Sequence, residues 1–350
     1  MTSRLQQLRA AFAANNIDAF LVQKDVNIQY LTGFPARESW LLVCQRQAFY
    51  LTDFRYREEA RKGLKGVVVR QYAQSIVEEC FKMIQAQRCR RIGFEARHVT
   101  LAQYRLLEKN RPQGIQWAKT DHLVERFREV KSADEIQKIQ QALGLHKQAH
   151  QFLKRILKPH LTEKEVLLKL ERFVKSRDAG FSFDPIIAAG VNSSYPHAKV
   201  TARTIPNHHI VLIDMGVDVK GYKSDLTRIF FLGKIPPLIR DIYTHVQAAQ
   251  RRAIENIKPG VPAADVDRAA RHYLEEKHLA KYFGHALGHG VGLEIHEQPR
   301  LSQNDPAILR PGMVITVEPA VYVPGQFGIR CEDMVLVTPK GCRILSDDFH

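Results

Sequence analysis

Two β-like segments of the chain each carry a pair of carboxylates whose spacing suggests a shared site. Residues 208–233, HHIVLIDMGVDVKGYKSDLTRIFFLG, contain two apolar runs, which predict a hairpin that turns near Val219–Gly221. Asp214 and Asp225 are equidistant from the midpoint between Val219 and Lys220, so we expect them opposite each other on one face. Because like charges opposed among apolar neighbours are destabilising, this pair requires a compensating cation.

A second predicted hairpin repeats the arrangement. Residues 313–339, MVITVEPAVYVPGQFGIRCEDMVLVTP, are expected to turn at PGQFG. Glu318 and Glu332 are symmetric about Gly325, so these two carboxylates should also face each other. Four carboxylates that point inward would be hard to keep ionised without cations.

Imidazoles that could join the carboxylates lie in a glycine-rich stretch, residues 284–300, GHALGHGVGLEIHEQPR, which contains His285, His289 and His296. Each glycine would cost a helix about 1 kcal/mol relative to alanine, so a helix is not expected here. Glycines let backbone approach backbone or ligand closely, and His289 between two glycines is the best-placed imidazole. Four carboxylates and an imidazole form a ligand set for two divalent metals, in which oxygen favours manganese and nitrogen admits cobalt, zinc or iron.

Simpler interpretations of the same residues exist. A strand aspartate is more often a surface residue, and a glutamate before proline is more often a strand end. Other catalytic motifs do not fit, because Arg300 stands where an HExxH motif that starts at His296 needs its second histidine. The sequence also contains no GxSxG nucleophile elbow and no P-loop.

The elements around these motifs predict two domains. Helical and strand-like segments alternate in residues 1–127, which indicates an α/β domain. Near residue 128 this alternation gives way to a charged helical run, so we place the domain boundary there. Residues 128–350 group helices between strand-rich segments, 182–233 and 311 onward, which indicates α+β architecture. Capping boxes are expected at Ser132 with Glu135 and at Thr162 with Glu165, and Gly180 is expected to end the second of these helices. No tandem repeat of short fixed period is evident.

Bulk properties narrow the class of protein. A chain of 350 residues can bury two cores, and no segment has the length of a signal peptide core or a membrane span, so a cytoplasmic location is expected. Five cysteines without a CxxC pair are expected to be reduced thiols. The net charge is +15, but the basic residues form no stripe with interleaved aromatics, so neither a nucleic-acid partner nor a membrane partner is expected.

The chain resembles the pita-bread metallopeptidases, specifically the proline-directed branch that contains prolidase (Xaa-Pro dipeptidase) and aminopeptidase P. The resemblance covers nearly the whole chain. In the first half it rests on NIQYLTGF at 27–34 and on the connector VERFREVKSADEIQKIQQA at 124–142. In the second half the matching motifs, in order, are FDPIIAAGVNSSYPH, LIDMGVD, GYKSDLTRIFFLG, FGHALGHGVGLEIHE, PGMVITVEPAVYVPG and GIRCEDMV. The resemblance implies a curved antiparallel sheet with flanking helices, preceded by a smaller α/β domain of the creatinase/prolidase type.

The resemblance also implies roles for individual residues. The five positions of the metal ligands are those of Asp214, Asp225, His289, Glu318 and Glu332, with Asp225 and Glu332 bridging two ions. His197 and His296 correspond to positions that contact substrate and assist proton movement, and His285 corresponds to a position in the pocket. Arg330 corresponds to a residue that supports the site. Arg300 stands where some prolidases have an arginine that binds the carboxylate of a dipeptide. Departures from the family pattern are Ala320, Ala286-Leu287 and Cys331, none of which removes a ligand.

The implied activity is hydrolysis of the bond between an N-terminal residue and proline, in Xaa-Pro dipeptides or in longer peptides that start with Xaa-Pro. Two divalent ions, Mn²⁺ first and Co²⁺ or Zn²⁺ as alternatives, would hold a hydroxide for attack, with Glu318 accepting the proton of the water. Methionine aminopeptidase shares the ligands but not the first domain, and creatinase shares the domains but works without metal. A homodimer is implied as well. The alternative function is a catalytically silent binding protein that presents its basic surface to an acidic partner.

Overall fold

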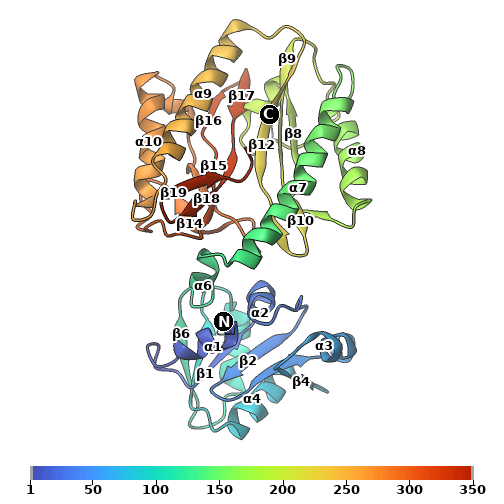
Figure 1. Cartoon of the computed structure of the whole chain (residues 1–350). Helices are drawn as coiled ribbons and strands as arrows, with labels where there is room; N and C mark the ends of the chain where they lie inside the picture. The colour runs from blue at the N-terminus through green and yellow to red at the C-terminus, as the bar shows by residue number, and fades with distance from the viewer. Residues whose placement is uncertain (1–2, 348–350) are drawn as a thin grey trace. The chain divides into compact units, whose positions relative to one another are not determined.

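The computed structural model describes residues 3–347 and divides the chain into two compact units, of which the first ends at Arg128 and the second begins at Glu129 (Figure 1). Among the described residues, every helix is too short or too polar to cross a lipid bilayer. Each unit has its own buried apolar cluster, as expected for a chain of this length.

The first unit is built on one sheet of six strands in the order β4-β3-β2-β1-β5-β6. Strands β1, β2 and β3 pair antiparallel, whereas β4, β5 and β6 each join a neighbour in parallel. The mixed α/β character expected from the sequence is confirmed. The strands are β1 Ala19–Val22, β2 Trp40–Cys44, β3 Ala48–Thr52, β4 Val68–Gln71, β5 Arg91–Glu95 and β6 Gln116–Thr120. The helices are α1 Arg4–Ala10, α2 Asp25–Thr32, α3 Arg57–Gly63, α4 Ile76–Ala86, α5 Leu101–Lys109 and α6 Glu125–Glu129.

The second unit begins with a helix pair that packs on a three-stranded antiparallel sheet. Helices α7 (Ala133–Ile156) and α8 (Glu163–Lys175) share an apolar cluster with β8 (Ile186–Ala189) and β9 (His209–Met215), and β12 (Leu226–Leu232) completes this sheet. Both capping boxes predicted for these helices are confirmed. The prediction that Gly180 ends the second helix is wrong, because α8 ends at Lys175 and Gly180 opens the short strand β7 (Gly180–Phe181).

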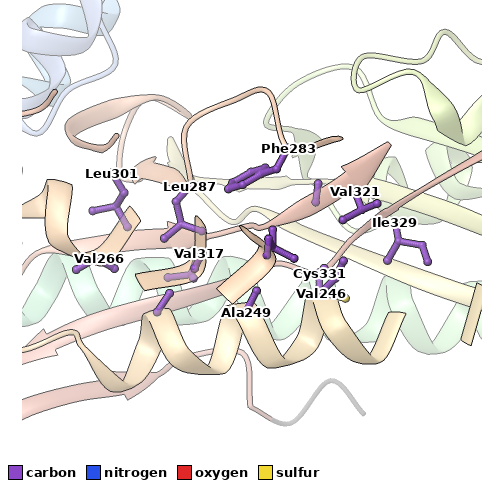
Figure 2. Close-up of a cluster of buried hydrophobic side chains, with 14 of the residues drawn as sticks. Val246, Ala249, Val266, Phe283, Leu287, Leu301, Val317, Val321, Ile329 and Cys331 are labelled. Carbon is purple, nitrogen blue, oxygen red and sulfur yellow. The ribbon is translucent and has the colours of Figure 1, made fainter. Parts of the chain in front are cut away.

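The unit continues with a second helix pair and a second group of strands. Helices α9 (Pro237–Glu255) and α10 (Ala263–Glu276) pack on a five-stranded sheet of order β14-β13-β15-β18-β19. Figure 2 shows part of this core, in which Val246 and Ala249 of α9 lie with Val317, Val321 and Ile329 from the strand segments. The strands are β13 Gly288–Gly290, β14 Glu297–Leu301, β15 Val314–Val317, β18 Asp333–Thr338 and β19 Gly341–Ile344, and β16 Ala320–Val323 pairs separately with β17 Phe327–Arg330.

The two helix pairs of the second unit are variants of one motif. His160 and Gly260 precede α8 and α10 at corresponding places, and both have positive φ, 74° and 86°. Their amides donate to equivalent distant carbonyls, His160 to Ile205 and Gly260 to Leu309. The two helix pairs are therefore joined by structurally equivalent turns, which no short repeat in the sequence indicated.

Candidate metal centre

The first predicted hairpin forms, but its register differs from the prediction. Strand β10 (Val217–Val219) pairs with β11 (Tyr222–Lys223) around Lys220 and Gly221, which both have positive φ as a type I′ turn requires. As a result Asp214 lies opposite Thr227, and the prediction that Asp214 directly faces Asp225 is wrong. A displacement of two residues preserves the face of the strand, so Asp225 remains on the side of the sheet that Asp214 occupies.

The second hairpin has the predicted register. Val317 of β15 lies opposite Asp333 of β18, and Ala320 of β16 lies opposite Arg330 of β17. Both pairings are symmetric about Gly325. Glu318 and Glu332 are symmetric about the same residue, so they occupy opposed positions in the short gap between the two paired segments. The prediction that the two glutamates face each other is confirmed.

The glycines around His289 allow close approach of backbone segments, as expected. A Cβ atom added to Gly288 would lie 2.1 Å from the carbonyl oxygen of Thr316. At Gly290 it would lie 2.3 Å from the carbonyl oxygen of Gln298. Strand β13 is therefore enclosed between neighbours that exclude any side chain at these two positions, and His289 projects from a rigidly confined backbone.

Three of the predicted ligands form a tight group. One potential ligand atom from each of Asp225, His289 and Glu332 lies within 4.8 Å of the other two. Nε2 of His289 is 3.5 Å from Oδ2 of Asp225 and 3.4 Å from Oε1 of Glu318. Nδ1 of His289 is 3.1 Å from the carbonyl oxygen of Gly290, which can only accept, so Nδ1 carries a proton. Burial disfavours a charged imidazole, but Glu318 outweighs this effect and the pKa of His289 is raised, so without metal Nε2 donates toward Glu318 and would present its lone pair only to a bound ion.

Asp214 joins the group through a buried network. Arg330 donates to Oδ2 of Asp214 and, through Nε, to the hydroxyl of Thr227 at 2.9 Å. That hydroxyl donates in turn to Oε2 of Glu332 at 2.8 Å. Arg330 also donates to the hydroxyl of Tyr322. Arg330 thus connects ligands supplied by both hairpins, Asp214 directly and Glu332 through Thr227.

Burial and mutual repulsion oppose ionisation of the carboxylates. Burial, followed by the neighbouring acidic groups, raises the pKa of Asp225 and of Glu332 well above their usual ranges. Burial also raises the pKa of Asp214, although Arg330 opposes this effect. At Glu318 burial is again the largest single effect, but His289 and Arg330 together outweigh it, so the pKa is lowered.

Unsatisfied oxygens test whether a divalent cation suits this group. Oδ1 of Asp214 and Oε1 of Glu332 are buried without a hydrogen-bond partner among residues 3–347. A buried carboxylate oxygen without a hydrogen-bond partner destabilises the folded state, and this destabilisation is removed if the oxygen coordinates a cation. The donor set of carboxylate oxygens and one imidazole nitrogen suits a hard or borderline divalent ion. The residues present therefore fit a metal centre.

The other predicted histidines surround this group at different distances. The ring of His296 lies 4.4 Å from that of His289, and burial followed by His289 lowers the pKa of His296. His285 lies deeper, with Nε2 3.5 Å from the hydroxyl of Tyr322, and burial lowers its pKa. His197 is exposed on the loop after the 3₁₀ turn Gly190–Ser194, and it is among the groups that lower the pKa of His296.

Arg300 is exposed on β14 and is the cross-strand partner of His289. Opposed residues of antiparallel strands project from the same face. The side chain of Arg300 therefore lies on the face of the sheet that carries His289.

Several supporting residues were missed in the sequence. Thr316 accepts from the amide of His289 at 3.0 Å and donates to Oε1 of Glu318 at 3.2 Å, and Thr227 and Tyr322 complete the network around Arg330. The alternation of side chains along a strand could have revealed two of them, because a polar residue two positions from a ligand lies on the same face of the strand. For two of the three missed residues the pairs are Asp225 with Thr227 and Thr316 with Glu318.

Comparisons with known proteins agree with this geometry. Residues 137–339 match the model of metallopeptidase family M24, and residues 4–130 match the creatinase/prolidase N-terminal domain. An Xaa-Pro dipeptidase of Pyrococcus furiosus is 35% identical over 351 residues, which cover 99% of this chain and 98% of the relative.

Two solved structures extend the likeness to the fold. An Xaa-Pro dipeptidase from Bacillus anthracis superimposes with a TM-score of 0.94 at 34% identity, covering 99% of this chain and 97% of that one. An X-Pro aminopeptidase from Thermotoga maritima gives a TM-score of 0.89 at 30% identity, covering 96% and 97%. The α+β architecture expected from the sequence is confirmed, and the chain belongs to metallopeptidase family M24.

Proposed function

We propose that this chain is an exopeptidase that uses two divalent ions, Mn²⁺ foremost, to hydrolyse the bond between an N-terminal residue and proline. The observation that carries the proposal is the buried group of Asp225, His289 and Glu332, together with the unsatisfied oxygens of Asp214 and Glu332. A purely binding role would leave this costly acidic group without a purpose. The substrate class is inferred from relatives that are named Xaa-Pro dipeptidase and X-Pro aminopeptidase.

Five residues would hold the ions: Asp214, Asp225, His289, Glu318 and Glu332, with Asp225 and Glu332 shared between them. Bound divalent ions supply a nucleophile from water near neutral pH and polarise the substrate carbonyl. We assign this chemistry to residues 128–350, with residues 1–127 as a separate N-terminal domain. A cytoplasmic homodimer is part of the same proposal.

The chain's own side chains then handle the proton and the substrate. Glu318 has a lowered pKa, so it is ionised near neutral pH and can accept the proton of the attacking water. His296 has a lowered pKa and is therefore a neutral imidazole, which can donate one hydrogen bond to the scissile carbonyl oxygen. His197 would assist from the exposed loop. The leaving prolyl nitrogen carries no N–H in the substrate and must be protonated as the bond breaks.

Arg300 bears on the choice between a dipeptidase and an aminopeptidase. Its position on the face that carries His289 suits a contact with the free carboxylate of an Xaa-Pro dipeptide. A longer peptide lacks a carboxylate at that place. We therefore favour the dipeptide as the substrate.

One assay tests the proposed function. The chain is stripped with chelator, restored with Mn²⁺ or Co²⁺, and given an Xaa-Pro dipeptide and an Xaa-Pro-Xaa tripeptide. Metal-dependent hydrolysis that is faster for the dipeptide is expected. Faster cleavage of the tripeptide would overturn the dipeptide preference, and no metal-dependent cleavage of either would overturn the function.

A further inference from the structure

A buried carboxylate outside the metal-binding group organises the loop that carries His197. Glu163 is the first residue of α8 and is fully buried. Its Oε1 accepts from the amide of Ala189 at 2.8 Å and from the side chain of Asn192 at 3.0 Å. Its Oε2 accepts from Asn192 at 2.9 Å and from the amide and the hydroxyl of Thr201 at 2.9 and 2.7 Å.

These contacts fix both ends of a short segment. Asn192 precedes His197 by five residues and Thr201 follows it by four, so one carboxylate closes the segment that bears the histidine. The side chain of Asn192 also donates to the carbonyl of Lys199 at 3.1 Å inside the same segment. His197 is itself exposed, as is Tyr195 two residues before it, so the histidine depends on its backbone for its position.

The far side of the segment is attached to the strand that supplies Arg330. The hydroxyl of Ser193 accepts from the amide of Gly328 at 2.9 Å, and the carbonyl of Pro196 accepts from Arg330 at 3.2 Å. A Cβ atom at Gly328 would lie 2.0 Å from the carbonyl oxygen of Ser193. The loop thus joins Glu163 on one side to the network of the metal ligands on the other.

Glu163 is not required to start its helix. Thr162 already caps α8 by accepting from the amide of Glu165, and Glu165 reciprocates as the capping-box partner. In the second helix pair, the residue that corresponds to Glu163 is Ala263, and α10 forms without a carboxylate at that position. The carboxylate of Glu163 therefore serves the loop rather than the helix.

We propose that Glu163 is a positioning residue, which holds the segment 189–201 so that His197 reaches the scissile carbonyl. This inference rests on the proposed function for its catalytic part. It assigns the placement of His197 to the carboxylate of Glu163, which lies outside the five proposed metal ligands.

The variant Glu163→Gln tests the inference. Each carboxylate oxygen accepts from at least two donors, so an amide nitrogen would face N–H groups in either orientation. Glu165→Gln is the matched control, because it makes the same change two residues along on the exposed side of α8. Lys199 and Arg203 are exposed and offer trypsin sites within and just after the segment. Trypsin should cut there at least about tenfold faster in Glu163→Gln, whereas the control should match the wild type.

A double-mutant cycle with His197→Ala separates positioning from general damage. Glu163→Gln should lower kcat about a hundredfold with unchanged Mn²⁺ affinity by calorimetry, because a displaced catalytic group loses alignment. In the His197→Ala background the same substitution should cost less than about threefold, since the group that it positions is gone. Thr201→Val, which removes one donor, provides a second variant if Glu163→Gln fails to fold.

Two results would overturn the inference. Equal losses of kcat in both backgrounds would show that Glu163 does not act through His197, and unchanged trypsin cleavage would show that it does not hold the loop. If the wild-type chain hydrolysed no Xaa-Pro peptide, the proposed function and the catalytic part of the inference would both fail. The trypsin comparison would still decide independently whether Glu163 holds the segment.

Discussion

Arg330 donates a hydrogen bond to Asp214, and both side chains are buried beside three other acidic groups. Its guanidinium is positioned by Thr227 and Tyr322 as well, so it is held in a fixed orientation. This buried cation partly compensates the carboxylates when metal is absent, and it fixes which oxygen of Asp214 is left to coordinate an ion.

Replacing Arg330 with methionine should destabilise the metal-free chain by about 3–5 kcal/mol, because a buried carboxylate then loses its partner. Urea unfolding in chelator measures this change. The matched control is Arg310→Met, which breaks the more exposed ion pair of Arg310 with Glu129 and should cost no more than about 1 kcal/mol. Equal costs for the two variants would contradict the role assigned to Arg330.

The contribution of Asp225 and Glu332 to the stability of the metal-free chain should decrease as pH rises above their unfolded pKa values. Asp225 and Glu332 have folded pKa values well above their unfolded values near 4, so their protonated forms favour the folded state. The contribution is fully present below about pH 4 and is lost as pH rises through the folded pKa values. Urea unfolding at a series of pH values measures the slope.

Excess Mn²⁺ should reverse this trend, since metal binds the deprotonated ligands and binds more tightly at higher pH. Burial also raises the pKa of Glu95 in the first unit to about 7, so Glu95 contributes to the pH dependence of stability both with and without metal. The difference between the series in chelator and the series in Mn²⁺ therefore reports on the metal-binding group. Parallel slopes in chelator and in Mn²⁺ would argue against metal coordination by Asp225 and Glu332.

Two glycine substitutions should change stability in opposite directions. Gly290→Ala places a Cβ 2.3 Å from a backbone oxygen, so overpacking should cost at least about 1–3 kcal/mol and displace His289. Gly144 lies in the middle of α7, where a Cβ meets no described atom within 4 Å, so Gly144→Ala should stabilise the chain by about 0.5–1 kcal/mol. Thermal unfolding distinguishes them, and a neutral Gly290→Ala would show that β13 is less confined than the geometry requires.

The sequence was sufficient to predict features that depend on residues close together in the chain. The register around Gly325 followed from the symmetry of Glu318 and Glu332, because the loop between the paired strands is itself symmetric. The register around Lys220 was displaced because the turn is of type I′, and Gly221 at its second central position was the overlooked signal.

Features that depend on distant residues could not be read from the sequence. Glu163 receives its hydrogen bonds from residues 26 to 38 positions away, and nothing in the capping box distinguishes it from a solvent-exposed helix residue. The equivalent turns of the two helix pairs lie at His160 and Gly260, whose residue types differ although both have positive φ. These relationships emerge only when the tertiary contacts are known.

Manganese titration of the chelator-treated chain tests the central claim most directly. By calorimetry the wild type should bind two Mn²⁺ ions per chain, as a shared pair of bridging carboxylates requires. Asp225→Asn should bind at most one and should lose hydrolysis of Xaa-Pro peptides, whereas the exposed control Glu165→Gln should bind as the wild type does. Two ions bound by Asp225→Asn with undiminished affinity and full hydrolysis would contradict the account.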